Sequence, residues 1–188
     1  MYAELLNYQD GWQAVKDAAL NTIGKEHGKY PDDAWKYRML LAEHSPIRLL
    51  TYTVRLHDLP YWVSVHLTRH KIGVEHFVST QRTDRTGEDR TALRQDALVT
   101  HTLHINAQAL IAISRKRLCN MAAPETRQAW QAVVDAVRAQ DPIVAQVCVR
   151  ECIYRGFCPE LYGCTAAETP AYRLHRESYV CGALVRIC

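Results

Sequence analysis

The sequence has no apolar run long enough to cross a lipid bilayer, because Arg, His, Asp or Gln interrupts its apolar stretches every few residues. Its first six residues lack the basic and then apolar pattern of a secretion signal. We therefore expect a soluble, cytoplasmic protein with no membrane partner. Internal repeats and low-complexity tracts are absent as well. With 188 residues, 48% of them apolar, the chain is long enough for one domain with a substantial core, and we expect residues 1–188 to form it.

A strong charge of either sign is also missing, since the formal net charge is +3 with nine histidines. This balance suits small anionic ligands such as nucleotides and falls short of the concentrated positive charge of a dedicated nucleic-acid binder. A nucleotide- or nucleic-acid-binding module without catalysis remains an alternative, because four arginines lie between residues 82 and 94. Acidic residues between 84 and 89 weaken that positive field.

The periodicity of apolar residues predicts both helices and strands. Spacings of three and four predict helices at about residues 10–24, 32–44, 61–68, 104–118 and beyond 124. Alternation from Arg48 to Leu56 gives the clearest strand, and residues 74–81 are expected to be extended. Residues 57–60 predict a turn that leads into a helix, and the charged residues 82–90 predict a loop. Residues beyond 140 are less regular.

Two groups of polar residues are candidates for a site. Arg69, His70 and Lys71 are adjacent at the end of a predicted helix, where they can contact phosphate or polarise carbonyl oxygens, or simply cap that helix end. Asn106 and Arg117 are eleven residues apart, close to three helical turns, so they project from one face about 16 Å apart. On geometry alone, both would reach solvent where the helix leaves the core.

The order of these residues along the chain resembles that of the flavin-dependent thymidylate synthases. In that family a helix ends in Arg-His-Arg, and a Ser and an Arg follow it. A later helix begins Asn-x-Arg-Ser-Leu, with an Arg eleven residues after the Asn and a Glu eight further on. This sequence has His44-Ser45-Pro46, Pro60, Arg69-His70-Lys71, Ser79, Asn106, Arg117 and Glu125 in the same order. The resemblance covers roughly residues 10–130.

The resemblance implies the roles of several residues. FAD would contact Ser45, Arg69, His70, Lys71 and Asn106, and dUMP or a related pyrimidine nucleotide would contact His66, Ser79, Gln81, Arg82, Arg90 and Arg117. Arg117 would be the catalytic residue, because its charge can stabilise the negative charge that develops on a uracil carbonyl oxygen. The implied reaction is reductive methylation of dUMP to dTMP with methylenetetrahydrofolate and NADPH, in which the cofactors carry the difficult chemistry.

Several departures from the family pattern bear on these roles. Lys71 replaces the third Arg and lacks its planar fork, and Gln108 replaces the Arg of the second motif. Arg82 follows Ser79 by three residues instead of two, and Arg94 is an alternative to Arg90 as a phosphate ligand. A flavin-dependent one-carbon modification of another pyrimidine nucleotide is therefore a second hypothesis within the same class.

Residues 140–188 form a divergent, cysteine-containing segment. Four of the seven cysteines, Cys148, Cys152, Cys158 and Cys164, are close enough in sequence for a zinc site or an iron–sulfur cluster. Their spacings match no standard pattern, and free cysteines are commonly small buried apolar residues, so no metal is the preferred prediction. A structural metal-binding protein remains the third hypothesis.

The expected fold class is α+β, with one antiparallel sheet and helices packed on it, as in the flavin-dependent thymidylate synthases. A homotetramer is implied only by the resemblance, since active sites in that family take residues from several subunits.

Overall fold

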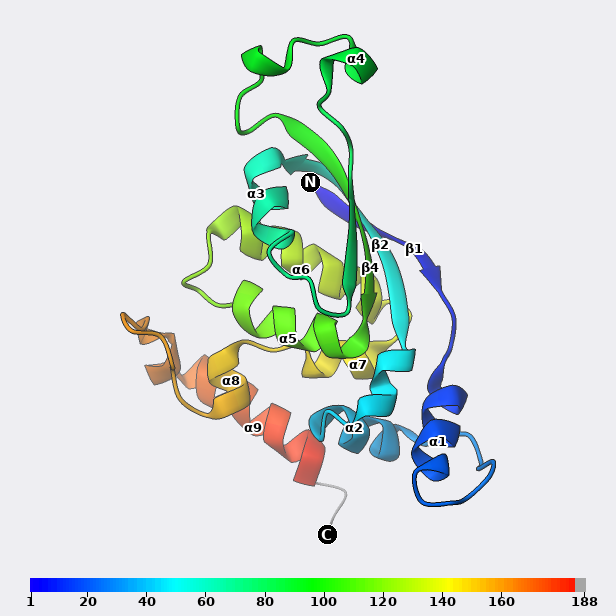
Figure 1. Ribbon diagram of the computed structural model, residues 1–188. Coiled ribbons are helices and arrows are strands. Elements are labelled where there is room, and N and C mark those ends of the chain that lie inside the picture. Colours follow the sequence, from blue (N-terminus) through cyan, green and yellow to red (C-terminus); the bar gives the residue numbers. More distant parts are fainter. Residues whose placement is uncertain (185–188) are drawn as a thin grey trace.

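The computed structural model describes residues 1–184, with side chains described to Cys181, and confirms the α+β fold class (Figure 1). Four strands form one antiparallel sheet in the order β1-β2-β4-β3: β1 (Tyr2–Tyr8), β2 (Thr51–Pro60), β3 (Val74–Val78) and β4 (Leu98–Asn106). Within residues 1–184, no helix is long and apolar enough to cross a membrane.

Helices cover one face of the sheet. The longer ones are α1 (Trp12–Asn21), α2 (Asp33–Leu41), α3 (Tyr61–Leu67), α5 (Ala107–Arg117), α6 (Pro124–Arg138) and α9 (Pro170–Leu184). Shorter elements are η1 (Ser45–Leu49), α4 (Thr83–Thr86), η2 (Arg90–Ala92), α7 (Pro142–Val147), α8 (Glu151–Arg155) and η3 (Thr165–Glu168). In Figure 1, α4 and η2 lie on an excursion between β3 and β4 that extends beyond the helices.

Strand β2 shows why the sheet buries one face only. Tyr52, Val54 and Leu56 are fully buried beneath the helices, while the residues between them face the other side and are partly exposed. Helix α6 packs against this buried face. Its residues Trp130, Val133 and Val137 lie on one side of the helix and are almost fully buried.

The ends of β2 and β4 differ from the sequence prediction. Residues 57–60 belong to β2 rather than to a turn, because a bulge between Leu56 and Leu59 lets the strand continue, with Asp58 at φ 54°. The helix expected from His104 begins at Ala107, because β4 runs through to Asn106. Strand β1 was not predicted, and the loop expected at residues 82–90 contains the short helix α4.

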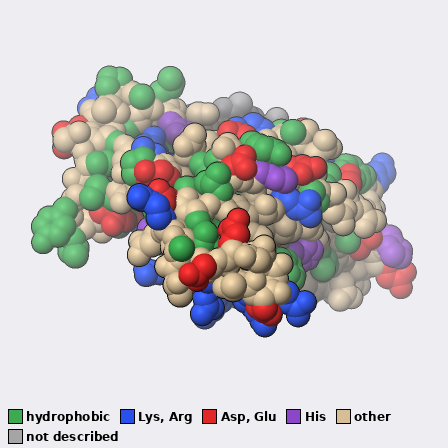
Figure 2. Space-filling view, turned by 90° about the horizontal axis from the view of Figure 1, so that it is seen from above, with side chains coloured by type: hydrophobic (Ala, Val, Ile, Leu, Met, Phe, Trp, Pro, Cys, Tyr) green, Lys and Arg blue, Asp and Glu red, His purple; other side chains and the backbone are tan. Residues whose placement is uncertain are grey.

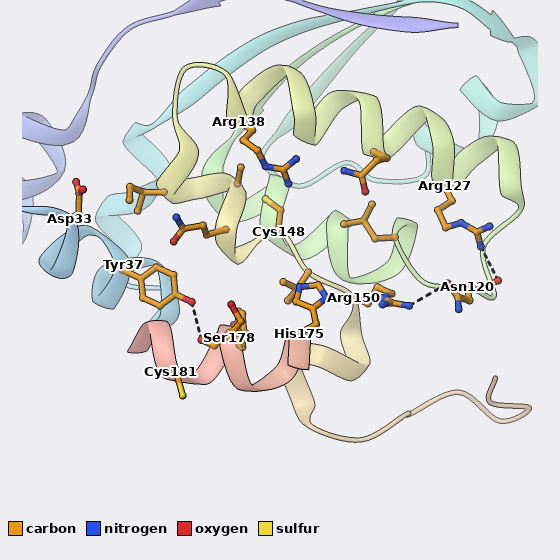
Figure 3. Close-up of a pocket in the computed structure, with 17 residues that line it drawn as sticks. Asp33, Tyr37, Asn120, Arg127, Arg138, Cys148, Arg150, His175, Ser178 and Cys181 are labelled. Atoms are coloured by element: carbon orange, nitrogen blue, oxygen red, sulfur yellow. Dashed lines mark hydrogen bonds between the residues drawn. The ribbon is translucent and has the colours of Figure 1, made fainter. Parts of the chain in front are cut away.

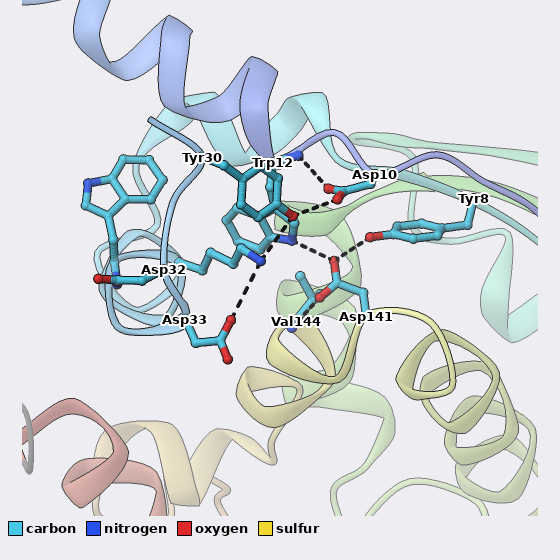
Figure 4. A network of polar contacts seen from close by, with 10 residues as sticks. Tyr8, Asp10, Trp12, Tyr30, Asp32, Asp33, Asp141 and Val144 are labelled. Carbon is cyan, nitrogen blue, oxygen red and sulfur yellow. Dashed lines mark hydrogen bonds and ion pairs between the residues drawn. The ribbon is translucent and has the colours of Figure 1, made fainter. Parts of the chain in front are cut away.

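A buried carboxylate fastens the N-terminal elements to the helical layer (Figure 4). Asp141, at the start of α7, is 3% exposed and accepts hydrogen bonds from Trp12 Nε1 at 3.1 Å and the Tyr52 hydroxyl at 2.9 Å. It also caps α7 by accepting from the backbone N–H of Val144 at 3.2 Å. Burial and the nearby Asp141 raise the pKa of Tyr52 far above its ordinary value, so the phenol stays a donor.

Candidate functional site

The C-terminal ends of α3 and α5 meet at Arg117. Its Nε donates to His70 Nε2 at 2.8 Å, and its Nη2 donates to the backbone carbonyl of His66 at 2.9 Å. The two residues of the side-chain pair lie 47 positions apart in the sequence. We call Arg117, His66 and His70 the Arg117 junction.

His70 is held in its neutral form at this junction. Burial, the adjacent Arg117 and His76 lower the pKa of His70 to about 4. A guanidinium can only donate, so the Nε2 atom that it contacts must be the unprotonated nitrogen of the ring. The imidazole therefore accepts a hydrogen bond that holds the guanidinium in place, and because the ring is neutral it does not repel the positive charge of Arg117.

Two further histidines support His70 from the sheet. His76 Nε2 lies 2.6 Å from the carbonyl oxygen of His70, and His76 Nδ1 lies 3.0 Å from His101 Nε2. His101 is fully buried on β4, where burial and His76 lower its pKa to about 4. Its Nδ1 has no hydrogen-bond partner among residues 1–184. The sequence pattern did not predict a role for either residue, because the pairing of His76 with His101 depends on β3 lying beside β4.

His66 faces α6 at the other side of the junction. Its Nδ1 lies 3.2 Å from the hydroxyl of Thr126, which is fully buried, and its ring packs edge-on against Trp62. Burial, Arg117 and Arg69 lower the pKa of His66. Burial and Arg69 also lower the pKa of Arg117, because two cations share this corner of the molecule.

Arg69 and Lys71 flank His70 and are both exposed. Neither takes part in any of the ion pairs formed within the described part of the chain. Two exposed cations without a carboxylate partner suit an anionic ligand, so this donor set fits the pyrophosphate of a dinucleotide.

Asn106 lies at the opposite end of α5. Asn106 caps that helix by accepting from the N–H of Ala109 at 2.9 Å, and its own N–H donates to the carbonyl of Gly73 at 2.9 Å. Gly73 has φ 73°, and a Cβ there would lie 2.6 Å from Asn106 Nδ2. Ser45 is exposed at the start of η1, and Leu50, just after η1, accepts from the N–H of Ala107. Gln108, in the position of the family's Arg, accepts from Arg48 Nε.

The residues expected to hold the nucleotide phosphate lie on or beside the excursion between β3 and β4. Ser79 Oγ accepts from the N–H of Thr100 at 3.0 Å, which places it on the exposed side of the sheet edge. Arg82 forms an ion pair with Asp84 at 2.7 Å, and Arg94 pairs with Asp96 at 3.0 Å. Arg90 is exposed, and Gln81 is half-buried. The structure therefore brings Arg117 and His70 together but leaves this group apart from them.

Figure 2 views the molecule from the end that carries this excursion, and basic and acidic side chains are interspersed on that face. The ion pairs of Arg82 with Asp84 and of Arg94 with Asp96 agree with this mixture of charges. This end of the molecule does not present a continuous basic surface.

The clustered cysteines do not form a metal centre in the part of the chain that the structure describes. Within residues 1–184, no group of three or more His, Cys, Asp or Glu is arranged to hold a metal ion. Cys148 and Cys152 are buried, and burial raises the pKa of the Cys148 thiol to about 12. The terminal Cys188 lies outside the described residues.

Comparison with known proteins gives matches in structure only. No protein-family model and no curated protein matches the sequence. Two solved structures of the flavin-dependent thymidylate synthase ThyX from Helicobacter pylori, both with FAD and dUMP, match with a TM-score of 0.62. They are 14% and 16% identical to this chain, covering 80% and 79% of it and 100% and 99% of their own length.

A third structure is the UMP/dUMP methylase PolB from Streptomyces cacaoi, bound with 5-Br dUMP. It matches with a TM-score of 0.61 at 14% identity, over 82% of this chain and 94% of that one. The class of structure is thus clear: an antiparallel sheet covered by helices. The chain has the fold of the flavin-dependent thymidylate synthases, and the resemblance seen in the sequence is confirmed at that level.

Proposed function

We propose that this protein is a flavin-dependent enzyme that reductively methylates dUMP to dTMP, using methylenetetrahydrofolate and NADPH. The observation that carries the proposal is the Arg117 junction. Two motifs that are remote in the sequence meet there through a 2.8 Å hydrogen bond, in a fold shared with enzymes crystallised with FAD and dUMP. Neither motif is specific alone. Two unrelated helix ends would have no reason to form a direct hydrogen bond in this fold, so the contact between the motifs favours a shared site.

The flavin would bind along the cations beside His70. Arg69 and Lys71 would hold its pyrophosphate, and Asn106, at the start of α5, and Ser45 would contact other parts of the cofactor. When bound, the reduced flavin supplies the hydride and mediates transfer of the one-carbon unit. The protein supplies the positions of the groups and the charge around them.

Arg117 would act on the pyrimidine. Its Nε and Nη2 are held by the junction, whereas Nη1 makes no hydrogen bond within residues 1–184 and remains able to donate to a uracil carbonyl oxygen. Carbon 5 becomes nucleophilic as negative charge moves onto that oxygen, and a fixed cation in a partly buried site stabilises it without reorganisation. His66 would contact the nucleotide beside Arg117.

The remaining nucleotide contacts would come from a neighbouring subunit. We propose a homotetramer in which Ser79, Gln81, Arg82 and Arg90, with Arg94 as the alternative to Arg90, hold the phosphate of a nucleotide that a different subunit's Arg117 polarises. The support is that Ser79 bonds to Thr100 at the exposed edge of the sheet and Arg82 pairs with Asp84, whereas Arg117 is held by His70 and His66 at the helix ends.

The proposal is tested first by the visible absorbance of freshly purified protein, followed by titration with dUMP. We expect a flavin band that dUMP perturbs, and dTMP on addition of methylenetetrahydrofolate and NADPH. Arg117→Ala should lower turnover by about 100-fold or more while flavin stays bound, because it removes the group that stabilises the developing charge. Arg38→Ala, an exposed arginine of α2, is the matched control and should leave turnover unchanged. Protein that neither retains nor takes up flavin would contradict the proposal and favour the binding-module hypothesis.

A second candidate is methylation of UMP or another pyrimidine nucleotide. It is favoured by the match to a UMP/dUMP methylase and by the shift of Arg82 by one residue relative to Ser79. Turnover of UMP and dUMP measured side by side decides between the two. Preference for dUMP supports thymidylate synthesis, and preference for UMP supports this second candidate.

A further inference from the structure

A cavity of about 980 Å³ opens between α6 and α9 (Figure 3). Its walls come from α2, α6, α7 and α9, and residues that follow α5 and α7 complete it. None of the residues of the Arg117 junction or of the proposed flavin and nucleotide contacts lines it. Thr126 contacts His66 at the junction, whereas the next residue, Arg127, lines the cavity, so the start of α6 separates the two places.

One end of the cavity is positively charged. Arg127 Nη1 donates to the carbonyl of Asn120 at 3.3 Å, and Arg150 Nη1 lies 3.4 Å from Asn120 Oδ1. Asn120 thus holds two guanidinium groups at the same place. Neither arginine forms an ion pair within residues 1–184. His175 lies at the same end, where burial and the charge of Arg150 lower its pKa.

The other end of the cavity is neutral and carries aromatic and apolar groups. Arg138 is eleven residues beyond Arg127 on α6, three turns or about 16 Å away, and it is already paired with Asp135. Asp33 is paired with Lys36 at 3.7 Å. Tyr37 lies on the wall at this end, and Ile143 also lines the cavity. The cavity therefore has an anion-binding end and an end suited to a planar, less polar group.

We propose that this cavity is a second binding site, for a nucleoside phosphate whose phosphates contact Arg127 and Arg150 and whose base lies toward Tyr37. The volume lies at the upper end of the range of roughly 300–1,000 Å³ for small-molecule sites. Guanidinium groups that are not neutralised by a carboxylate are common phosphate ligands in proteins, and this cavity has two of them. Asn120 keeps both in position before the ligand arrives, Arg127 through its backbone carbonyl and Arg150 through its side-chain oxygen.

The test is calorimetric titration of the full-length protein with ATP, with adenosine and inorganic pyrophosphate as partial ligands. ATP should bind more tightly than either partial ligand, and Arg127→Gln and Arg150→Gln should each weaken ATP binding by about tenfold or more, since each removes one charge-assisted contact. Arg150→Lys should restore part of the affinity. Arg173→Gln, an exposed arginine of α9 that does not line the cavity, is the matched control and should change nothing.

The same titration separates this site from the proposed active site. Arg117→Ala and saturating dUMP should leave ATP binding unchanged, and the result does not depend on whether the protein turns over dUMP. ATP that does not bind, or that binds equally to the Arg127→Gln and Arg150→Gln proteins, would overturn the proposal. Pyrophosphate that binds as tightly as ATP would overturn the assignment of the aromatic end.

Discussion

At the scale of single residues, the environment of His101 makes a prediction about stability and pH, because its fully buried ring must stay neutral. Its pKa lies at about 4 in the folded protein, against 6.5 for an ordinary histidine. The folded value is the lower one, so stability is fully present above pH 6.5 and is lost as the pH falls toward 4. Between pH 7 and pH 5 this one group should cost roughly 2 kcal/mol of unfolding free energy.

His101→Gln tests this loss, because glutamine keeps a donor toward His76 but does not titrate. Urea unfolding at pH 7 and pH 5 should show a loss smaller by roughly 2 kcal/mol in the variant than in the parent protein. The other histidines with lowered pKa values titrate equally in both proteins and cancel in the comparison. Equal losses in the two proteins would mean that His101 accepts a proton without unfolding.

The residues of the Arg117 junction illustrate what the sequence can and cannot predict at this scale. Helical periodicity placed Arg117 on a solvent-facing helix end, and only the family resemblance linked it with His70. The direct contact between them depends on how α3 and α5 pack against the sheet. The contacts by which His76 and His101 hold His70 could not be predicted, because neither strand alone shows that β3 and β4 lie side by side and bring their histidines together.

At the scale of elements, the hydrogen-bond network around Asp141 should control how α1 and α7 attach to the sheet. Asp141→Ala removes the acceptor for Trp12 Nε1 and the Tyr52 hydroxyl and the cap of α7. Buried donors left without partners cost about 1–3 kcal/mol each, so we expect a loss of about 3 kcal/mol or more in unfolding free energy. Denaturant unfolding measures this directly.

The exposed Asp135, on α6, provides the control for that measurement. It contacts only the side chains of Gln131 and Arg138, so Asp135→Ala should change the unfolding free energy by about 0.5 kcal/mol or less. If Asp141→Ala were equally mild, the buried carboxylate would not be the link between these elements.

The strands show which element patterns can be recognised in the sequence. Alternation in β2 was visible because its buried positions are Tyr, Val and Leu. Alternation in β4 was obscured because a buried position holds His101, which is polar in the sequence but neutral in the fold. Strand β1 was missed because a register shift between Leu5 and Asn7 breaks its period of two.

At the scale of the whole molecule, the residues assigned to the nucleotide lie in two places: His66 and Arg117 at the Arg117 junction, and the others on or beside the excursion between β3 and β4. Ser79 Oγ accepts from the N–H of Thr100 near the start of β4, whereas Asn106, a proposed flavin contact, ends that strand. Arg117 is the last residue of α5, a helix on the other face of the sheet, and is partly buried, whereas Ser79 lies at the exposed side of the sheet edge. No periodicity in the sequence predicts this separation, which depends on the arrangement of the entire sheet.

A subunit-mixing experiment tests whether neighbouring chains complete each site. Arg117→Ala and Ser79→Ala should each be inactive alone, and co-expression of the two should restore dUMP methylation, because some sites then combine an intact Ser79 with an intact Arg117 from different chains. Co-expression of Arg117→Ala with the double variant Arg117→Ala, Ser79→Ala is the matched control, since no intact site can form. If the first mixture stays as inactive as the control although the chains co-purify, then Ser79 and Arg117 act within one chain or Ser79 has another role, and the shared-site proposal fails.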